Sequence, residues 1–539
     1  MHNWMISSAR WRFLIAVLLV LGIFFRFVNL DRKIYWFDET YTSLRVSGYT
    51  EQEVIGQVFD GSIISVEDLL KYQHTNPEKN LANTIESLAK EDAQHGPLYY
   101  IIVRLWVQWL GNSPAVTRSL SALISLLVFP CIYWLCLELF ESPIVGWTAV
   151  ALIAVSPFHV LYAQEAREYS LWTVTILLSS AALLRAMRLK TKASWGTYAA
   201  MLALSLYTFL FTGLVALGHG IYVGLTERFR LTKISIAYLL SSLAGLLAFL
   251  PWLLVVINGF FRIQKTTSYL NQKMSLLGLV SKIAVRPGYA FVDLNPYSPE
   301  LKLTISLILQ SFLNIIVLII VLYSIYFLCS KSYQRGWLFN LTLIGSTFLT
   351  LLVADLMLGG LKSTINRYLV PYFLGIQLSV AYLFAARLTS KYEKIQSRKL
   401  WQLSMITLLS CGVISCAISS QSIIWWNKGP NYYNPYLAHI INQTEHPLVV
   451  SDDRTHNKPL ANVIGDIISL TYMLEPKVRL QLVVEPNLPK IPDGCSDVFL
   501  FNPSKVLRNG LEKQNYKLKL LYEKNRPNHT SFWKLEVKQ

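Results

Sequence analysis

The sequence is poor in charged residues and lacks the motifs that many soluble enzymes carry. Only 15% of its 539 residues are charged, whereas about a quarter are charged in a typical soluble chain. It contains no P-loop, GxSxG, HExxH or nucleotide-binding glycine pattern. These absences argue against a soluble nucleotide-dependent enzyme.

Cysteine is also scarce. Cys495 stands alone near the end of the chain, and no CxxC pair occurs. The other five cysteines lie in apolar segments, at Cys131, Cys136, Cys329, Cys411 and Cys416. This distribution offers neither a disulfide framework nor a cysteine metal site, and it leaves the redox compartment open.

Long apolar segments are what the chain does have. Apolar residues make up 53% of it, its mean hydropathy is +0.39, and runs of about twenty apolar residues recur. We expect about eleven spanning helices, near residues 11–30, 116–139, 143–162, 169–187, 194–210, 211–226, 234–256, 301–329, 337–358, 368–387 and 401–423. The first run is too long for a signal-peptide core and has no small-residue cleavage site, so we expect it to remain as a helix.

The basic residues predict how these helices are oriented. The net charge is +17, but most Lys and Arg lie in short loops between apolar runs, which is typical of cytoplasmic loops. The clusters lie at residues 10–12, 185–192, 228–233, 331–335 and 387–399. They share one side if the N-terminus is cytoplasmic and the C-terminus is outside. We therefore expect a multi-pass protein of the cell (inner) membrane. Its expected partner is the lipid bilayer, and we expect it to bind no nucleic acid.

One further apolar segment, His95–Leu110, is not expected to span. It is 16 residues long, carries Arg104 near its middle, and is rich in Trp and Tyr, which favour the membrane interface. Counting it as a span would also place the later basic clusters outside. We expect it to lie flat on the outer surface, within an outer loop of juxtamembrane helices over residues 31–115.

The last part of the chain predicts a small folded domain. Strand-like runs at Leu448–Ser451, Val478–Val484, Asp497–Phe501, Tyr516–Tyr522 and Phe532–Val537 alternate with helical stretches near 458–474 and 504–513. The predicted fold is therefore an α-helical polytopic membrane domain over 1–424, followed by a small C-terminal α/β extracytoplasmic domain over 425–539.

Polar residues at membrane depth are costly and commonly mark function. Asp38 and Glu39 follow the first span between aromatic residues. They suit a general base or a cation site, or else the cap and first turn of an interfacial helix. His95, before Gly96-Pro97, is either a ligand or a turn residue. Arg118, at the outer end of the second span, is either functional or an arginine that reaches lipid phosphate.

The turn between the third and fourth spans holds the densest polar group. Gln164, Glu165, Arg167 and Glu168 directly precede Tyr169, which is more than a loop requires, although a solvated loop is the alternative.

A further group enters the tenth span from the same predicted side. It consists of Arg367 and Tyr368 after Lys362, and Arg286 is a weaker candidate in the loop 257–300. Arginines with carboxylates among them suit recognition of a phosphate beside an acid–base site. Because no nucleotide motif accompanies them, a membrane-borne activated substrate is favoured.

These motifs resemble, in their order, those of bacterial GT-C glycosyltransferases. The most similar group is glycosyltransferase family 39, the protein mannosyltransferase and aminoarabinose transferase superfamily. The resemblance covers roughly residues 10–390. The residues that carry it are Asp38-Glu39, His95-Gly96-Pro97-Leu98-Tyr99, Arg118, Ser156-Pro157-Phe158, Gln164-Glu165-Ala166-Arg167-Glu168-Tyr169, and Arg367-Tyr368 with Pro371.

The resemblance implies a polyprenyl-phosphate sugar donor and an inverting single displacement. It implies Asp38 as the general base on an acceptor hydroxyl, with Glu39 and Glu165 as further catalytic candidates. Arg118, Arg167 and Arg367 become candidates to hold the donor phosphate. The other candidate substrate-binding residues are His95, Gln164, Tyr169 and Tyr368.

Departures from the family pattern leave the acceptor open among glycan, lipid and protein. The chain has no large β-trefoil domain, Trp425-Trp426 is followed by Asn427 where oligosaccharyltransferases have Asp, and His95-Gly96-Pro97 stands where aminoarabinose transferases have Lys-Pro. No cofactor is implied with certainty, and a divalent cation is the one candidate.

Two other functions remain as alternatives to a transferase. One is a lipid-linked sugar flippase or transporter, which would need polar or broken helices near mid-membrane. Asp355 comes closest to such a position. The other is a non-catalytic membrane scaffold, which would not explain Asp38.

Overall fold

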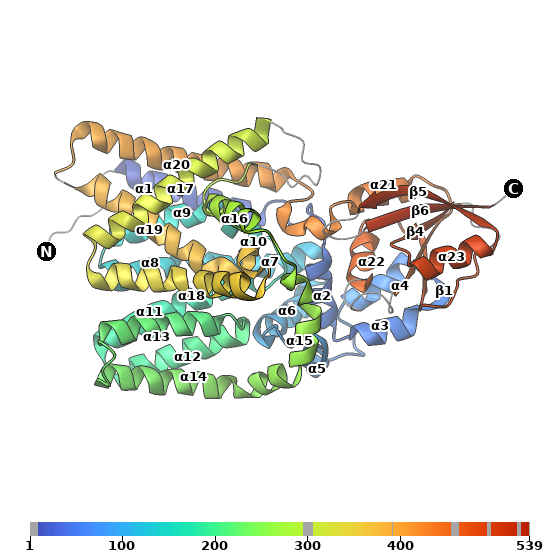
Figure 1. Ribbon diagram of the computed structural model, residues 1–539, viewed down its shortest axis with the longest axis horizontal. Helices are drawn as coiled ribbons and strands as arrows, with labels where there is room; N and C mark the ends of the chain where they lie inside the picture. The colour runs from blue at the N-terminus through green and yellow to red at the C-terminus, as the bar shows by residue number, and fades with distance from the viewer. Residues whose placement is uncertain are drawn as a thin grey trace.

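The computed structural model describes residues 9–294, 305–390, 392–453, 463–492, 497–524 and 530–537. A bundle of long helices carries a smaller mixed sheet at one of its ends (Figure 1). Cys495, the predicted helical residues 458–462 and the start of the predicted span 301–329 lie outside the described residues.

The bundle contains the segments predicted to span. Its helices are α1 (Ala9–Phe27), α7 (Pro114–Leu126), α8 (Val128–Phe140), α9 (Pro143–Ala154), α10 (Pro157–Ala163), α11 (Tyr169–Leu189), α12 (Lys192–Thr208), α13 (Thr212–Thr226), α14 (Lys233–Asn258), α17 (Ile305–Lys331), α18 (Gln334–Leu358), α19 (Val370–Thr389) and α20 (Ile395–Gln421). In the described part of the chain, seven helical segments are long and apolar enough to cross a membrane, or eight if the bent pair α9–α10 is one span. The chain is thus a multi-pass membrane protein, and the number of eleven spans stays a prediction.

Four of the predicted spans are not among these seven segments: one is 143–162, the bent pair α9–α10, and the other three are missing for visible reasons. Helix α1 carries three arginines. Helices α12 and α13 have only 17 and 15 residues, which at 1.5 Å per residue is less than the roughly 30 Å hydrocarbon core of a bilayer.

The predicted span 143–162 is bent by 61° between α9 and α10. Pro157 occupies the first position of α10 after Ser156. Proline has no N–H to continue the α9 hydrogen bonds, but it fits a helix start. The Ser156 hydroxyl donates to the carbonyl of Ala290 at 2.7 Å, so the bend joins α10 to the chain that follows α16 (Leu276–Tyr289).

The basic connections lie together at one end of the bundle. The links α11–α12, α13–α14, α17–α18 and α19–α20 are at the end away from the sheet (Figure 1). The charge pattern predicts this grouping. Which side of the membrane it faces stays a prediction.

The first loop, 31–115, is folded throughout. It contains α2 (Phe37–Ser47), α3 (Glu51–Val58), β1 (Asp60–Ser65), α4 (Val66–Leu70), η1 (Lys71–Gln73), α5 (Leu81–Glu91) and α6 (Pro97–Leu110). Helix α6 is the segment expected at the interface. Its Trp109 is 81% exposed, whereas Arg104 is fully buried and donates to the carbonyl of Val46 at 2.6 Å.

The sheet joins this loop to the C-terminal part of the chain. Its order is β1-β3-β2-β4-β6-β5, with β2 (Pro447–Asp452), β3 (Arg479–Val483), β4 (Asp497–Phe501), β5 (Tyr516–Lys524) and β6 (Thr530–Val537). Strand β2 is parallel to β3 and β4, and β1 is antiparallel to β3, with Ile63 opposite Gln481. All five strands predicted in 425–539 are present, and β1 adds a strand that the sequence did not predict.

Helices cover both faces of the sheet. The flanking helices are α21 (Asn434–Asn442), α22 (Val463–Thr471) and α23 (Lys505–Lys513). Apolar residues of α3, α4, α21 and α22 form one core with the strands, and those of α23 form another. Helix α2 packs directly against α22. The approach is so close that a side chain at Gly465 would collide with the rings of Phe37 and Tyr41. The start of α2 is thereby held between bundle and sheet.

Candidate active site

The site is built around the first turn of α2, which carries Asp38 and Glu39. Free backbone N–H groups at a helix start favour negative charge there. Consecutive helical residues point about 100° apart, so the two carboxylates have different surroundings.

Glu39 is fully buried and its carboxylate is saturated with donors. Arg118 reaches both oxygens, each at 2.7 Å, and Lys428 Nζ lies 2.6 Å from Oε2. The backbone N–H of Ala166 donates to Oε1 at 2.9 Å. Burial disfavours the charged form, but Arg118 and Lys428 outweigh it and hold the pKa of Glu39 below its usual range.

Arg118 has no N–H group left for a phosphate. Besides its two bonds to Glu39, it donates to the carbonyls of Leu30, Lys33 and Ile34 at 2.6, 2.9 and 2.8 Å. It is fully buried, so it does not reach lipid headgroups either. Arg118 instead fixes the turn between α1 and α2.

Gln164 also bonds only to the protein. Its Nε2 donates to the carbonyls of Phe25 and Val28 at 2.8 Å each, and its Oε1 accepts from Lys33 Nζ at 3.1 Å. Gln164 thus ties the turn after α10 to the end of α1.

Asp38 is paired with Arg367, which lies in η4 (Asn366–Leu369). Nη1 of Arg367 is 2.9 Å from Oδ2 of Asp38, and both side chains are partly accessible, at 20% and 16%. The Arg367 guanidinium also lies over the ring of Tyr368, 5.6 Å from its centre.

Arg167, His95 and Glu168 form a second ionic group beside Asp38. His95 Nδ1 is 2.8 Å from Glu168 Oε1, and Arg167 Nη2 is 3.1 Å from His95 Nε2. Arg167 Nη1 also approaches the backbone carbonyl of Asp38 at 3.3 Å. Burial disfavours the charged form of Glu168, but Arg167 and His95 outweigh it and lower its pKa.

The His95 turn packs directly on the end of α12. A side chain at Gly96 would collide with the carbonyl of Tyr207, so glycine is required at this close approach. His95 itself forms an isolated bridge with Phe209.

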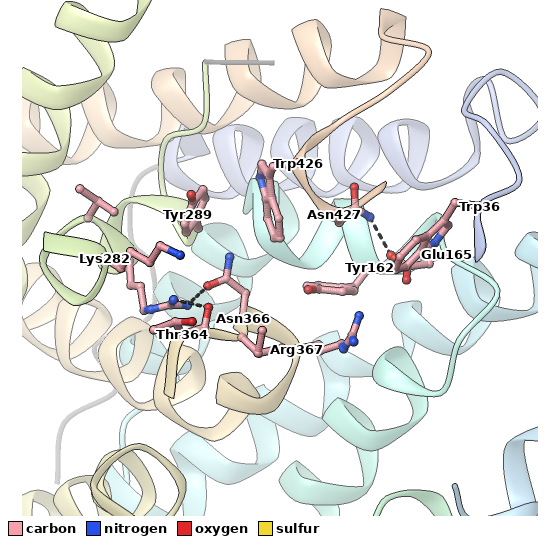
Figure 2. A pocket seen from close by; sticks show the side chains of 13 residues that line it. Trp36, Tyr162, Glu165, Lys282, Tyr289, Thr364, Asn366, Arg367, Trp426 and Asn427 are labelled. Atoms are coloured by element: carbon pink, nitrogen blue, oxygen red, sulfur yellow. Dashed lines mark hydrogen bonds between the residues drawn. The ribbon is translucent and has the colours of Figure 1, made fainter. Parts of the chain in front are cut away.

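Two cavities meet at Arg367. The first has a volume of about 300 Å³, and its lining includes Lys282, Arg286, Arg367, Glu165, Asn427 and Trp426 (Figure 2). The second has a volume of about 380 Å³, and its lining includes Asp38, Asp92, His95, Arg167, Tyr169, Arg367 and Tyr368. Glu39, Arg118 and Gln164 line neither.

The first cavity is mainly cationic. Lys282 and Arg286 are one turn apart on α16, and Arg286 is held by the side chain of Asn366 and the carbonyl of Thr364 (Figure 2). Its acidic member, Glu165, is fully buried and accepts from Asn427 Nδ2 at 2.7 Å. Burial raises the pKa of Glu165, and the positive charge of Lys428 only partly offsets this.

Solved structures share this architecture, although no family model and no curated protein matches the sequence. ArnT from Cupriavidus metallidurans bound to undecaprenyl phosphate is similar, with a TM-score of 0.50 and 12% identity over 98% of both chains. Its apo form has a TM-score of 0.50 and 11% identity over 98% of this chain and 99% of that one. The fold is that of the GT-C glycosyltransferases. AglB from Archaeoglobus fulgidus, in complex with an inhibitory peptide and a dolichol-phosphate, has a TM-score of 0.47 and 12% identity over 83% of this chain and 63% of that one.

Within this GT-C fold, several site residues escaped the sequence analysis. Asn427 and Lys428 lie just beyond the last apolar segment and were grouped with the C-terminal domain. Lys282 was also missed, although its spacing of four from Arg286 is a helical signal that both share one face.

The divalent-cation prediction stays a prediction. Among the described residues, no group of three or more His, Cys, Asp or Glu side chains is placed to hold a metal ion.

Proposed function

We propose that this protein is an inverting glycosyltransferase, which moves a sugar from a polyprenyl-phosphate donor to an acceptor hydroxyl at the extracytoplasmic side of the membrane. The observation that carries the proposal is the position of Arg367, which lines both cavities and pairs with Asp38 at 2.9 Å. A phosphate site and a carboxylate base are thereby adjacent.

The donor phosphate fits the first cavity. Lys282, Arg286 and Arg367 supply three cations to its wall, and guanidinium groups suit phosphate oxygens in geometry and charge. The polyprenyl phosphate that leaves gains a negative charge as its bond to the sugar breaks. Cations fixed in place before the reaction stabilise that charge.

The acceptor fits the second cavity, with Asp38 at its border with the first. An acceptor oxygen there attacks the anomeric carbon from the side opposite the phosphate, and its proton passes to Asp38. The bond between the acceptor oxygen and the anomeric carbon forms as the bond between that carbon and the phosphate oxygen breaks. This displacement inverts the configuration of the anomeric carbon. Tyr169 and Tyr368 supply aromatic walls, and Arg167 and His95 supply polar groups.

Glu39, Arg118 and Gln164 have a different role in this proposal. Their donors and acceptors are engaged within the protein, and none lines either of the two cavities. We assign them to positioning: they fix the turn before α2 and so the place of Asp38.

The extracytoplasmic location of the site rests on the charge distribution. The basic connections lie at the end of the bundle opposite the sheet (Figure 1), and such clusters are typically cytoplasmic. The site and the sheet would then be outside.

A flippase and a transferase differ in what they release. Purified protein in nanodiscs would be incubated with an extract of the whole cell envelope, which supplies lipid-linked donors and lipid, glycan and protein acceptors. Free polyprenyl phosphate would be measured by mass spectrometry. The proposal predicts release by the unmodified protein and little release by Asp38→Asn. A donor that stays chemically intact with both proteins would contradict it.

A further inference from the structure

The short segment that joins the bundle to the sheet fixes buried carboxylates around the first cavity. Trp425 Nε1 and Trp426 Nε1 each donate to Asp293 Oδ2 at 2.7 Å. Asp293 is 4% exposed and lies just after α16, which carries Lys282 and Arg286.

The next two residues of the segment continue this pattern. Asn427 Nδ2 donates to Glu165 Oε2 at 2.7 Å, and Lys428 Nζ lies 2.6 Å from Glu39 Oε2. Four consecutive residues, 425–428, thus bind three carboxylates from distant parts of the chain. Such a set fixes the position of Asn427 and Glu165 in the cavity wall.

Glu165 and Asn427 each keep one acceptor oxygen unused. Oε1 of Glu165 and Oδ1 of Asn427 are buried and have no hydrogen-bond partner among the described residues. Both residues line the first cavity. A buried acceptor without a donor is costly and rare in native proteins, so two in one wall indicate a ligand that brings donors.

Lys282 lies across the first cavity from the acceptors Glu165 and Asn427 (Figure 2). The ring of Trp426 lies between them, and Arg286 is one helical turn from Lys282 on α16. A complementary ligand carries an anionic group at one end and hydrogen-bond donors at the other. A sugar phosphate has both, and an aromatic wall suits its apolar ring face.

We propose that Glu165 Oε1 and Asn427 Oδ1 form a recognition site for hydroxyl groups of the donor's sugar, one donating to each oxygen, while the phosphate lies beside Lys282 and Arg286. This deepens the proposed function and rests on it. The pair makes the enzyme selective for the sugar as well as for the lipid phosphate, since a ligand without these hydroxyls leaves both acceptors unpaired.

Soluble headgroup probes test this with the full chain in nanodiscs. Methyl phosphate and a panel of sugar 1-phosphates (glucose, galactose, mannose and arabinose) would be titrated by calorimetry. We expect at least one sugar 1-phosphate to bind about tenfold or more tightly than methyl phosphate. Glu165→Ala and Asn427→Ala should each remove most of that advantage and leave methyl phosphate binding within about twofold.

The controls separate this inference from the proposed function. Ser422→Ala, just before the segment and outside both cavities, should keep the sugar preference, and thermal unfolding verifies that each variant is folded. Arg286→Ala should weaken all the phosphates alike. Failure of methyl phosphate to bind would contradict the donor site itself. With phosphate binding intact, the inference is overturned if no sugar is preferred, if the preference survives both Ala variants, or if it requires Mg²⁺ and vanishes with a chelator.

Discussion

Arg367 Nη1 lies 2.9 Å from Asp38 Oδ2, and this ion pair stands where the two cavities meet. The two residues are 329 positions apart in the sequence. Asp38 belongs to the first loop and Arg367 to the entry of α19. The pair therefore joins the proposed base to the proposed phosphate site.

Replacing Asp38 by Asn keeps the size of the side chain but removes the charge that accepts a proton. We expect transfer to fall by about a hundredfold or more, which is the usual range for a general base, with normal membrane insertion. Initial rates in reconstituted vesicles measure this, and exposed Asp31→Asn serves as the control. Full activity of Asp38→Asn would show that Asp38 is not the general base and acts only at the start of α2.

Arg286 and Arg367 should control how the enzyme uses its donor. Loss of a charge-assisted hydrogen bond costs roughly 1.5–3 kcal/mol, so each Ala variant should need about ten to a hundred times more donor. Arg→Lys should restore only part of this, because lysine lacks the planar fork. The dependence of the transfer rate on donor concentration tests this prediction. If it is unchanged in both Ala variants, neither arginine binds the donor phosphate.

Arg118 should behave differently, because it is bonded only within the protein. Arg118→Ala leaves the buried Glu39 with a single cation, and breaking a buried ion pair costs about 3–5 kcal/mol. We expect a clearly lower Tm in detergent and a loss of folded protein. A variant with the wild-type Tm but a raised donor requirement would instead return Arg118 to the phosphate-binding role that the sequence suggested.

Much of this site was predictable because the sequence places its parts in recognisable local patterns. Asp38 stands beside aromatic residues after the first span, and Glu165 and Arg167 stand between two apolar helices. The bend in the span 143–162 has a local signal as well, in Ser156-Pro157.

The rest depends on long-range packing, which spacing does not report. Lys428 meets Glu39 across 389 residues, and strand β1 joins the sheet although Asp60–Ser65 carries a glycine and two serines. Arg118 and Gln164 have the residue types of a binding site. Only the structure shows that Glu39 and the carbonyls at the end of α1 and in the turn after it already accept from their donors.

Asp293 should make stability depend on pH. Burial raises its pKa from 3.8 to about 6, although Trp425 and Trp426 partly offset this. A raised pKa in the folded state means that the folded protein holds the proton of Asp293 more tightly than the unfolded chain does. The contribution of Asp293 to the free energy of unfolding is therefore fully present below about pH 4 and is lost as the pH rises through about 6. The shift corresponds to roughly 3 kcal/mol.

Asp293→Asn keeps an oxygen acceptor for the two indoles without the charge. As the pH rises from about 4 to 6.5, we expect the Tm of the unmodified protein to fall relative to the Tm of the variant. A difference that is constant over this range would show that Asp293 does not titrate there.

The topology can be tested with single cysteines in a cysteine-free background. Cysteines at Lys190, Arg230 and Lys394 should react only from the cytoplasmic side. Cysteines at Lys282 and at Lys477, which follows α22, should react only from outside. Labelling of position 477 from the cytoplasm would contradict the proposed orientation.

The most direct test of a polyprenyl-phosphate sugar transferase is a comparison of cell-envelope composition. Lipid-linked sugars and envelope glycans would be profiled by mass spectrometry in a deletion strain that carries either the unmodified gene or Asp38→Asn. With Asp38→Asn, we expect one glycan modification to disappear and one polyprenyl-phosphate sugar to accumulate. Identical profiles in the two strains, with equal amounts of protein in the membrane, would contradict the proposed activity.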